Sequence, residues 1–281
     1  MANYFLLPEG NVQIAFSGGR TSAYMLKQLI DANPDWPFDR VQVTFQNTGR
    51  EMPETYDFVR DVEENFGVPV TWLEYDTTSE NRFRVVNHAT ASRNGEPFEA
   101  LIRKRRYLPN QNMRFCTEEL KIRTAKRYLR YLGWDRWTNC VGIRYDEPHR
   151  LNKPPPKDRW VVWMPLAHAK ITKHHVGDFW KAQNFDLQLE NIKGTTPFGN
   201  CDGCFLKGES KIAELIRRHP ERAKWWEKME DLASSLAAKE AATFKKNTKR
   251  VEMRNFLDSQ GDWVFDSEDA LCQKDDGECM G

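Results

Sequence analysis

Residues 12–29 read VQIAFSGGRTSAYMLKQL and combine the residue types that bind an anion. An apolar run ends at Ser17-Gly18-Gly19, and an amphipathic helical pattern follows at once. Such a turn leaves backbone N–H groups unpaired at a helix N-terminus, where they can hold a phosphate or pyrophosphate. Glycines let the backbone approach the anion, and hydroxyl groups add donors. The residues predicted to contact the anion are Ser17, Gly18, Gly19, Arg20, Thr21 and Ser22.

The spacing in this segment excludes two common nucleotide motifs. No Gly-Lys-Ser/Thr follows the glycines, so it is not the P-loop of kinases and GTPases. The spaced third glycine of dinucleotide-binding folds is also missing. An ordinary tight strand-to-helix turn is the alternative interpretation.

Three of the six cysteines form a second set with chemical potential. Cys201 and Cys204 form a Cys-x-x-Cys in a glycine-rich stretch, and this spacing directs two thiolates at one metal. Cys116 lies at the start of a predicted helix, where the helix dipole favours a thiolate. Three thiolate ligands predict an iron–sulfur cluster, of the 4Fe-4S type, with one open iron that can handle sulfur or substrate. A structural zinc site and independent buried thiols are the alternatives. Cys140 lies in an apolar run and is expected to be a core thiol.

Basic residues provide further anion contacts. Arg144 is the first choice for a phosphate or sulfate, because a guanidinium binds two oxygens at once, and Lys121 is the second. Residues 103–106 and 121–130 form basic clusters, which are either solvated helix faces or contacts to a polyanion. The histidines His168, His174 and His175 are expected to be solvated or to cap a helix rather than to bind a metal.

These residues require a framework of alternating strands and helices, which predicts an α/β fold with a doubly wound, mainly parallel sheet. Helical patterns start near Ser22, Pro53, Glu99 and Glu118, and residues 146–158 are expected to form a loop because of their prolines. Residues 220–246 predict one or two helices. The expected strands are Val12–Phe16, Val41–Gln46, Val70–Tyr75, Thr138–Ile143 and Trp160–Met164.

Polar segments follow three of these strands. In open α/β sheets ligands bind beyond the carboxyl ends of the strands. We therefore expect three polar segments to converge and to form a single nucleotide pocket. They are the loop after the first strand, Asn47-Thr48-Gly49 after the second and Gly142-Ile143-Arg144 after a later one.

Composition limits the remaining possibilities. The chain of 281 residues has a net charge of +1 and no apolar run of membrane-spanning length, so we expect no membrane association and no general attraction to nucleic acid. No secretory signal is visible, which favours the cytoplasm and free or metal-bound cysteines over disulfides. We expect a nucleotide-binding domain at 1–170, a helical cysteine-bearing region at 171–265 and a tail at 266–281. A homo-oligomer is compatible with this sequence.

Several of these segments resemble the adenine nucleotide alpha-hydrolase (PP-loop ATPase) superfamily and, within it, the phosphoadenosine phosphosulfate (PAPS) reductase-like family. Residues 17–22 match its Ser-Gly-Gly-x-x-Ser loop, and Gly142-Ile143-Arg144 matches its Gly-x-Arg segment. Further similar segments are Asn47-Thr48-Gly49 with Pro53-Glu54-Thr55, Cys116–Lys121, Met164–Val176, Gly199–Cys204, Arg222–Glu227 and Glu278-Cys279. One departure is Thr117, which stands where cluster-bearing reductases have a second adjacent cysteine.

The resemblance implies two alternative enzymes. A sulfonucleotide reductase would bind PAPS or adenosine phosphosulfate (APS), use Cys279 as the nucleophile with Arg144 and Lys121 beside it, and be reduced by a thioredoxin- or glutaredoxin-like protein. An ATP-dependent iron–sulfur sulfurtransferase would use ATP and Mg²⁺ to adenylate and thiolate a base in tRNA or DNA. A nucleotide-binding regulator without turnover is a third possibility, and a cysteine without function in the tail is the alternative for Cys279.

Overall fold

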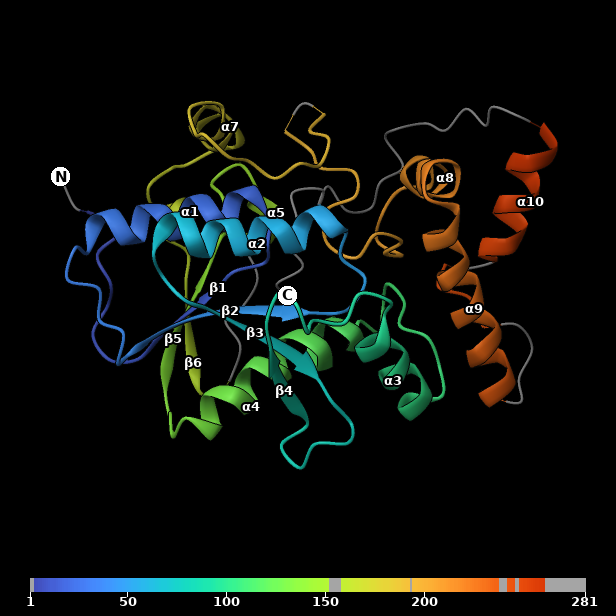
Figure 1. Cartoon of the computed structure of the whole chain (residues 1–281), viewed down its shortest axis with the longest axis horizontal. Helices are drawn as coiled ribbons and strands as arrows, with labels where there is room; N and C mark the ends of the chain where they lie inside the picture. The colour runs from blue at the N-terminus through green and yellow to red at the C-terminus, as the bar shows by residue number, and fades with distance from the viewer. Residues whose placement is uncertain (1–2, 152–157, 193, 238–241, 246–247, 261–281) are drawn as a thin grey trace.

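A six-stranded sheet with the strand order β4-β3-β2-β1-β5-β6 forms the centre of the molecule (Figure 1). The computed structural model describes residues 3–151, 158–192, 194–237, 242–245 and 248–260. Every neighbouring pair of strands is parallel except β3 and β4. The predicted α/β, mainly parallel, doubly wound fold is therefore confirmed. The strands are β1 (Val12–Ala15), β2 (Val41–Asn47), β3 (Val70–Tyr75), β4 (Phe83–Val86), β5 (Trp137–Val141) and β6 (Trp160–Trp163).

Helices cover both faces of this sheet. In Figure 1, α1 and α2 lie on one side and α4 on the other, and α8, α9 and α10 gather beyond one end of the sheet. The helices are α1 (Arg20–Ala32), α2 (Pro53–Phe66), α3 (Glu96–Arg105), α4 (Thr124–Tyr131), α5 (Pro148–Leu151), α6 (Pro165–His168), α7 (Lys173–Lys181), α8 (Glu209–Arg218), α9 (Pro220–Ala237) and α10 (Arg250–Gln260). A π-helical segment, η1 (Thr117–Arg123), precedes α4 directly.

The sequence explains the two helices next to the first strands. All four residues of β1 are buried, as expected of a central strand with helices on both sides. The α1 helix then buries an apolar face that includes Met25, Leu26 and Leu29. Pro53 begins α2, and Gly67 ends it in a left-handed conformation with φ 67°, which glycine adopts without strain.

Four details differ from the expectations. The edge strand β4 was not predicted, because it is short, Arg84 interrupts its apolar residues and two of its four residues are exposed. The expected loop at 146–158 contains α5, since Pro148 is tolerated in the first turn of a helix. The single helix predicted from Glu118 is divided into η1 and α4. Within the expected 220–246 segment, α9 ends at Ala237, and the additional helix α10 follows later.

The strand order reverses between β1 and β5, and in open α/β sheets ligands bind at such a reversal, beyond the carboxyl ends of the strands. Val12 pairs with both Val41 and Thr138, so the three strands are in register and end at the same edge. This edge positions the site described below.

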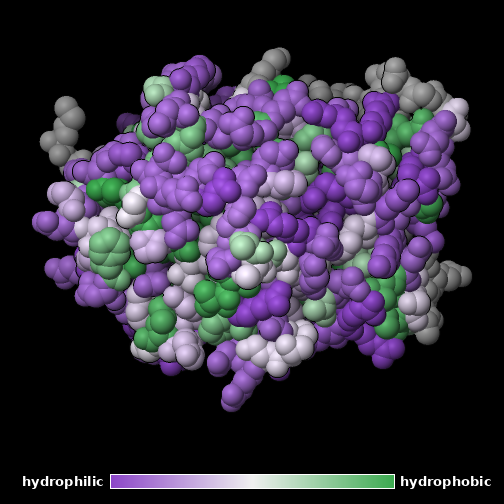
Figure 2. Space-filling model, viewed as in Figure 1, coloured by the Kyte–Doolittle hydropathy of each residue, from purple (hydrophilic) through white to green (hydrophobic). Residues whose placement is uncertain are grey.

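The surface in Figure 2 is mostly hydrophilic, with small separate hydrophobic areas. None of the helices in the described ranges is long and apolar enough to cross a membrane.

Candidate functional site

The loop at the end of β1 has the conformation that a close approach to an anion requires. Gly18 has φ +80°, and a Cβ at this position would lie 2.8 Å from Cγ2 of Thr55. The hydroxyl groups of Ser17 and Ser22 lie 2.9 Å apart, and the Ser22 hydroxyl also donates to the carbonyl oxygen of Gly19. The loop is thus held by its own serines at the start of α1, where the helix dipole favours an anion.

A segment from the helical region lies against this loop. Ser17, Gly18 and Gly19 share one pocket, the loop pocket, with residues that are far away in sequence. Those residues are Thr55, Leu187, Thr196, Gly199 and Asn200. The loop therefore faces the backbone that leads directly into the Cys-x-x-Cys.

Arg20 holds that segment in place. Its guanidinium donates to both carboxylate oxygens of Asp186, at 2.7 and 2.9 Å, and also to the carbonyl oxygens of Leu187 and Leu189. The side chain is accordingly directed to the covering segment. What Arg20 offers to an anion is the backbone N–H of the first residue of α1.

Arg144 connects the end of β5 to the first turn of α1. It is 5% exposed, its Nη1 donates to Oγ1 of Thr21 at 3.2 Å, and its Nε donates to Asp146. Gly142, directly after β5, is buried as well. The two predicted segments at the ends of β1 and β5 are therefore in contact.

Asn47 at the end of β2 and Thr48 directly after it are both buried, but they have different partners. Asn47 is fully buried, donates to Glu74 at 2.6 Å and accepts from the backbone N–H of Gly49 at 2.8 Å. Its amide therefore shapes the turn. Thr48 lies at the far side, where its hydroxyl is 3.3 Å from Sγ of Cys201.

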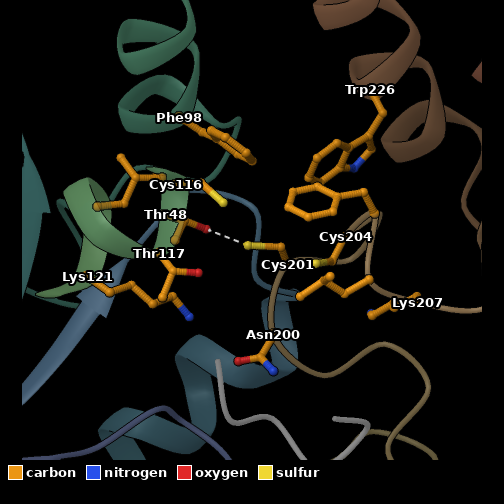
Figure 3. A pocket seen from close by; sticks show the side chains of 13 residues that line it. Thr48, Phe98, Cys116, Thr117, Lys121, Asn200, Cys201, Cys204, Lys207 and Trp226 are labelled. Atoms are coloured by element: carbon orange, nitrogen blue, oxygen red, sulfur yellow. Dashed lines mark hydrogen bonds between the residues drawn. The ribbon is translucent and has the colours of Figure 1, made fainter. Parts of the chain in front are cut away.

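The three cysteines that the sequence groups together line one cavity, the cysteine cavity (Figure 3). Its volume is about 40 Å³, and its walls come from the turn after β2, from α3, from η1, from the 200–207 segment and from α9. The lining residues are Thr48, Phe98, Cys116, Thr117, Leu120, Lys121, Asn200, Cys201, Cys204, Phe205, Leu206, Lys207 and Trp226. Lys121, a predicted anion contact, thus lies beside the thiols.

The thiol of Cys201 is kept neutral by its surroundings. Burial and the charge of Glu51 raise its pKa to about 12, while Lys121 and the hydrogen bond with Thr48 act in the opposite direction. A metal replaces the proton of such a thiol, because the ligand is the thiolate.

Cationic side chains fix the turn between Cys201 and Cys204. Asp202 is fully buried and accepts from Nη2 of Arg50 and from Nε1 of Trp226, each at 2.7 Å, as well as from Arg222. Nearby, Arg250 donates to the carbonyl oxygen of Gly203 at 3.0 Å. Sequence reasoning assigned no role to Arg50, Arg222 or Arg250. Their positive charges favour an anionic group at the two cysteines.

The donor set of the cavity fits an iron–sulfur cluster, because clusters are held by thiolates and three thiols line this one space. Among the described residues, no three His, Cys, Asp or Glu side chains are grouped closely enough to hold a metal ion. The metal site therefore stays a prediction.

Two further residues that the sequence analysis considered, His175 and Cys140, have structural roles. His175 accepts from the backbone N–H of Thr172 at 3.0 Å in a capping box, which confirms its capping role. Cys140 is fully buried against Met25, as a core thiol. Burial raises the pKa of Cys140 well above its ordinary value. Cys279 lies outside the described residues.

The basic clusters are largely taken up by ion pairs. Glu119 binds Arg105, Arg123 and Arg127, each at 2.9 Å, so that one carboxylate joins both clusters. Lys126 pairs with Asp158 at 2.7 Å. This arrangement agrees with the interpretation of the clusters as solvated helix faces. Because three guanidiniums surround the one carboxylate of Glu119, these four groups together keep a net positive charge.

Similar proteins are known from sequence. The model of the phosphoadenosine phosphosulfate reductase domain matches residues 11–186. The uncharacterized nin region protein ORF290 of Escherichia phage lambda is 34% identical over 210 residues, which are 71% of this chain and 67% of that protein. An uncharacterized protein of Methanocaldococcus jannaschii is 25% identical over 81% of this chain, which spans only 42% of its length.

Two solved structures are also similar. One is the PAPS reductase from Candida auris in its phosphate complex, with 16% identity, coverage of 62% of this chain and 72% of that chain, and a TM-score of 0.39. The other is the U34-tRNA thiolase NcsA from Methanococcus maripaludis with its [4Fe-4S] cluster, with 14% identity, coverage of 90% and 83%, and a TM-score of 0.35. From the extent of the domain match and the identity to the phage protein, the chain belongs to the phosphoadenosine phosphosulfate reductase domain family.

Proposed function

We propose that this chain is a sulfonucleotide reductase, which binds an adenylyl sulfate at residues 17–22 and reduces it to sulfite. The observation that supports this most is that the loop pocket and the cysteine cavity share Asn200 in their walls. A nucleotide whose phosphate lies on the loop would therefore have its outer end next to the thiols. Family membership favours the same substrate class.

The described residues would bind and orient the nucleotide. Backbone N–H groups of the loop and of the first turn of α1 bind the phosphate. Arg144, which already contacts Thr21 in that turn, adds a positive charge. Lys121 in the wall of the cysteine cavity offsets the charge of the outer group.

The reaction step would use Cys279. Its thiolate attacks the sulfur of the phosphosulfate, and the bond from sulfur to the bridging oxygen breaks, so that the adenosine phosphate leaves with the electron pair. A thiol of a thioredoxin- or glutaredoxin-like protein then attacks Sγ of Cys279 and releases sulfite. The second thiol of that dithiol closes its disulfide and frees Cys279, so that the carrier provides both electrons.

The cysteine cavity would hold the cofactor. Cys116, Cys201 and Cys204 are the thiols available for an iron–sulfur cluster, and Arg50 and Arg222 beside the turn offset its negative charge. When bound, such a cluster supplies an iron without a protein ligand.

Sulfite release tests the proposal. Anaerobically purified protein is incubated with ³⁵S-labelled APS or PAPS and reduced thioredoxin. Labelled sulfite is expected from one of them, and Cys279→Ser is expected to abolish its release. Cys272→Ser, in the same tail, is the matched control and should retain it. Equal rates in both variants would exclude Cys279 as the nucleophile.

A second candidate is an ATP-dependent sulfurtransferase. It is favoured by Thr117, which lines the cavity where a further cysteine ligand would stand in cluster-bearing reductases. In this reaction a nucleobase carbonyl oxygen attacks the α-phosphate of Mg²⁺-bound ATP and releases pyrophosphate, and hydrosulfide then attacks the activated carbon and displaces AMP. Pyrophosphate release that depends on tRNA or DNA would support it. Nucleotide binding without either turnover would instead indicate a regulator.

A further inference from the structure

Asn200 has an unusual backbone conformation directly before the first cysteine of the Cys-x-x-Cys. Its φ is +55°, in the left-handed region that side chains other than glycine rarely adopt. Asparagine is among the residues that tolerate this region best, and strained positions of this kind cluster at ligand sites. The residue is also 9% exposed.

This residue lies where the two cavities meet. It lines both the loop pocket, with Ser17 and Gly19, and the cysteine cavity, with Lys121. In Figure 3 the amide of Asn200 and the ammonium group of Lys121 point into the same space, on the side of the cysteine cavity away from Phe98 and Trp226. A ligand that extends from the loop to the thiols has to pass Asn200.

Two polar side-chain atoms here lack partners within the described part of the chain. Oδ1 of Asn200 is buried and accepts no hydrogen bond from the described residues, and Oγ1 of Thr55, on the loop pocket, is in the same situation. Buried polar atoms of native proteins are nearly always paired, so an unpaired one indicates a ligand or water that completes it. Two such atoms at one pocket indicate a polar ligand.

We propose that the side-chain amide of Asn200 determines specificity by binding the second anionic group of the nucleotide, the one attached to the 5′-phosphate. This inference rests on the proposed binding of an adenine nucleotide at residues 17–22. Rotation of the amide by 180° exchanges its oxygen and its N–H donors, so it can donate to an anion. The nearby ammonium group of Lys121 and the backbone N–H groups of the loop favour an anion at this position. The group is the sulfonate of an adenylyl sulfate or the β-phosphate of ADP, and AMP lacks both.

Calorimetric titration of AMP, ADP and APS into the full-length protein tests this assignment. Asn200→Gly removes the amide and suits the left-handed backbone, so the variant is expected to fold with an unchanged Tm. Loss of a hydrogen bond to a charged group should weaken ADP or APS about 10- to 100-fold and leave AMP unchanged. Asn200→Asp should weaken them further, because its carboxylate repels the anion. Asn184→Gly, an exposed asparagine, is the matched control and should bind all three normally.

Comparing the three nucleotides shows which anionic group Asn200 binds. Weaker binding of APS alone assigns the sulfonate, and weaker binding of ADP alone assigns the β-phosphate. Two results for Asn200→Gly would overturn the assignment while nucleotide binding stands. One is an affinity for ADP and APS equal to that of the wild type, and the other is an equal loss of affinity for all three nucleotides. If the wild-type protein binds none of the three and also fails to bind PAPS, both the assignment and the proposed function are wrong.

Discussion

Nη2 of Arg50 lies 2.7 Å from Oδ2 of Asp202, although 152 positions separate the two residues. Their side chains are 4% and 0% exposed. The pair joins the turn after β2 to the turn between Cys201 and Cys204, and thereby the edge of the sheet to the cysteine cavity. Burial lowers the pKa of Arg50, and the charge of Asp202 acts in the opposite direction.

Removal of this carboxylate should destabilise the fold. In Asp202→Ala the guanidiniums of Arg50 and Arg222 lose a buried counter-charge, so the free energy of unfolding should fall by about 3–5 kcal/mol. Denaturant titration measures the change. Asp178→Ala, whose pair with Lys181 is exposed, should leave the free energy of unfolding almost unchanged. A loss in Asp202→Ala no larger than in this control would show that the buried pair is not needed.

A side chain at Gly18 should abolish nucleotide binding. In Gly18→Ala the new Cβ meets Thr55 at 2.8 Å, in addition to the strain of the positive φ. Gly10→Ala has the same type of strain at φ +76° but no atom within 4 Å, so it is the matched control. Equilibrium dialysis with labelled adenine nucleotides should show loss of binding only in Gly18→Ala. Normal binding in this variant would contradict the role of the loop.

Iron content should follow the three cysteines of the cavity. After anaerobic purification, Cys116→Ser, Cys201→Ser and Cys204→Ser should lose iron, acid-labile sulfide and the visible thiolate-to-iron absorbance. Cys140→Ala, at the buried core thiol, should retain them. A wild-type protein without these signals would exclude the cluster, and zinc in its place would favour the structural metal site.

Glu119 should make stability depend on acidity. Burial opposes its charge, but Arg127, Arg123 and Arg105 together hold its pKa below the ordinary value of 4.5. A folded-state pKa below the unfolded value means that the stabilisation is present above about pH 4.5 and is lost as the pH falls through the folded pKa.

Unfolding experiments between pH 2 and pH 7 can measure this dependence. Glu119→Gln should be less stable than the wild type at pH 7, with a smaller difference at pH 2. Glu118→Gln is the matched control, because this exposed carboxylate pairs only with Arg123 among the described residues. Equal acid sensitivity in wild type and Glu119→Gln would contradict the expectation.

Much of the fold could be predicted because its signals are local. The buried β1, the helix α2 between Pro53 and Gly67, and the polar residues at the strand ends all follow from neighbouring residues. The strand β4 could not be predicted, since it is a short edge strand in which Arg84 interrupts the apolar residues. The sequence also has no local signal for the π-helical turns of η1.

The candidate site was only partly predictable for the same reason. Residue type and spacing were sufficient to group Cys116, Cys201 and Cys204. The roles of Asn200 and Asp202 depend on contacts between distant segments and on backbone conformation, neither of which the sequence pattern shows. The one available signal was their position, because Asn200 precedes the Cys-x-x-Cys and Asp202 lies within it.

A crystal structure of the anaerobically purified protein with adenosine phosphosulfate tests the central claim most directly. The account predicts that the 5′-phosphate lies on the backbone N–H groups of Gly18 and Gly19 and that the sulfonate points past Asn200 toward the cysteine cavity. A nucleotide bound away from this loop, or bound with its sulfonate directed away from Cys116 and Cys201, would contradict it.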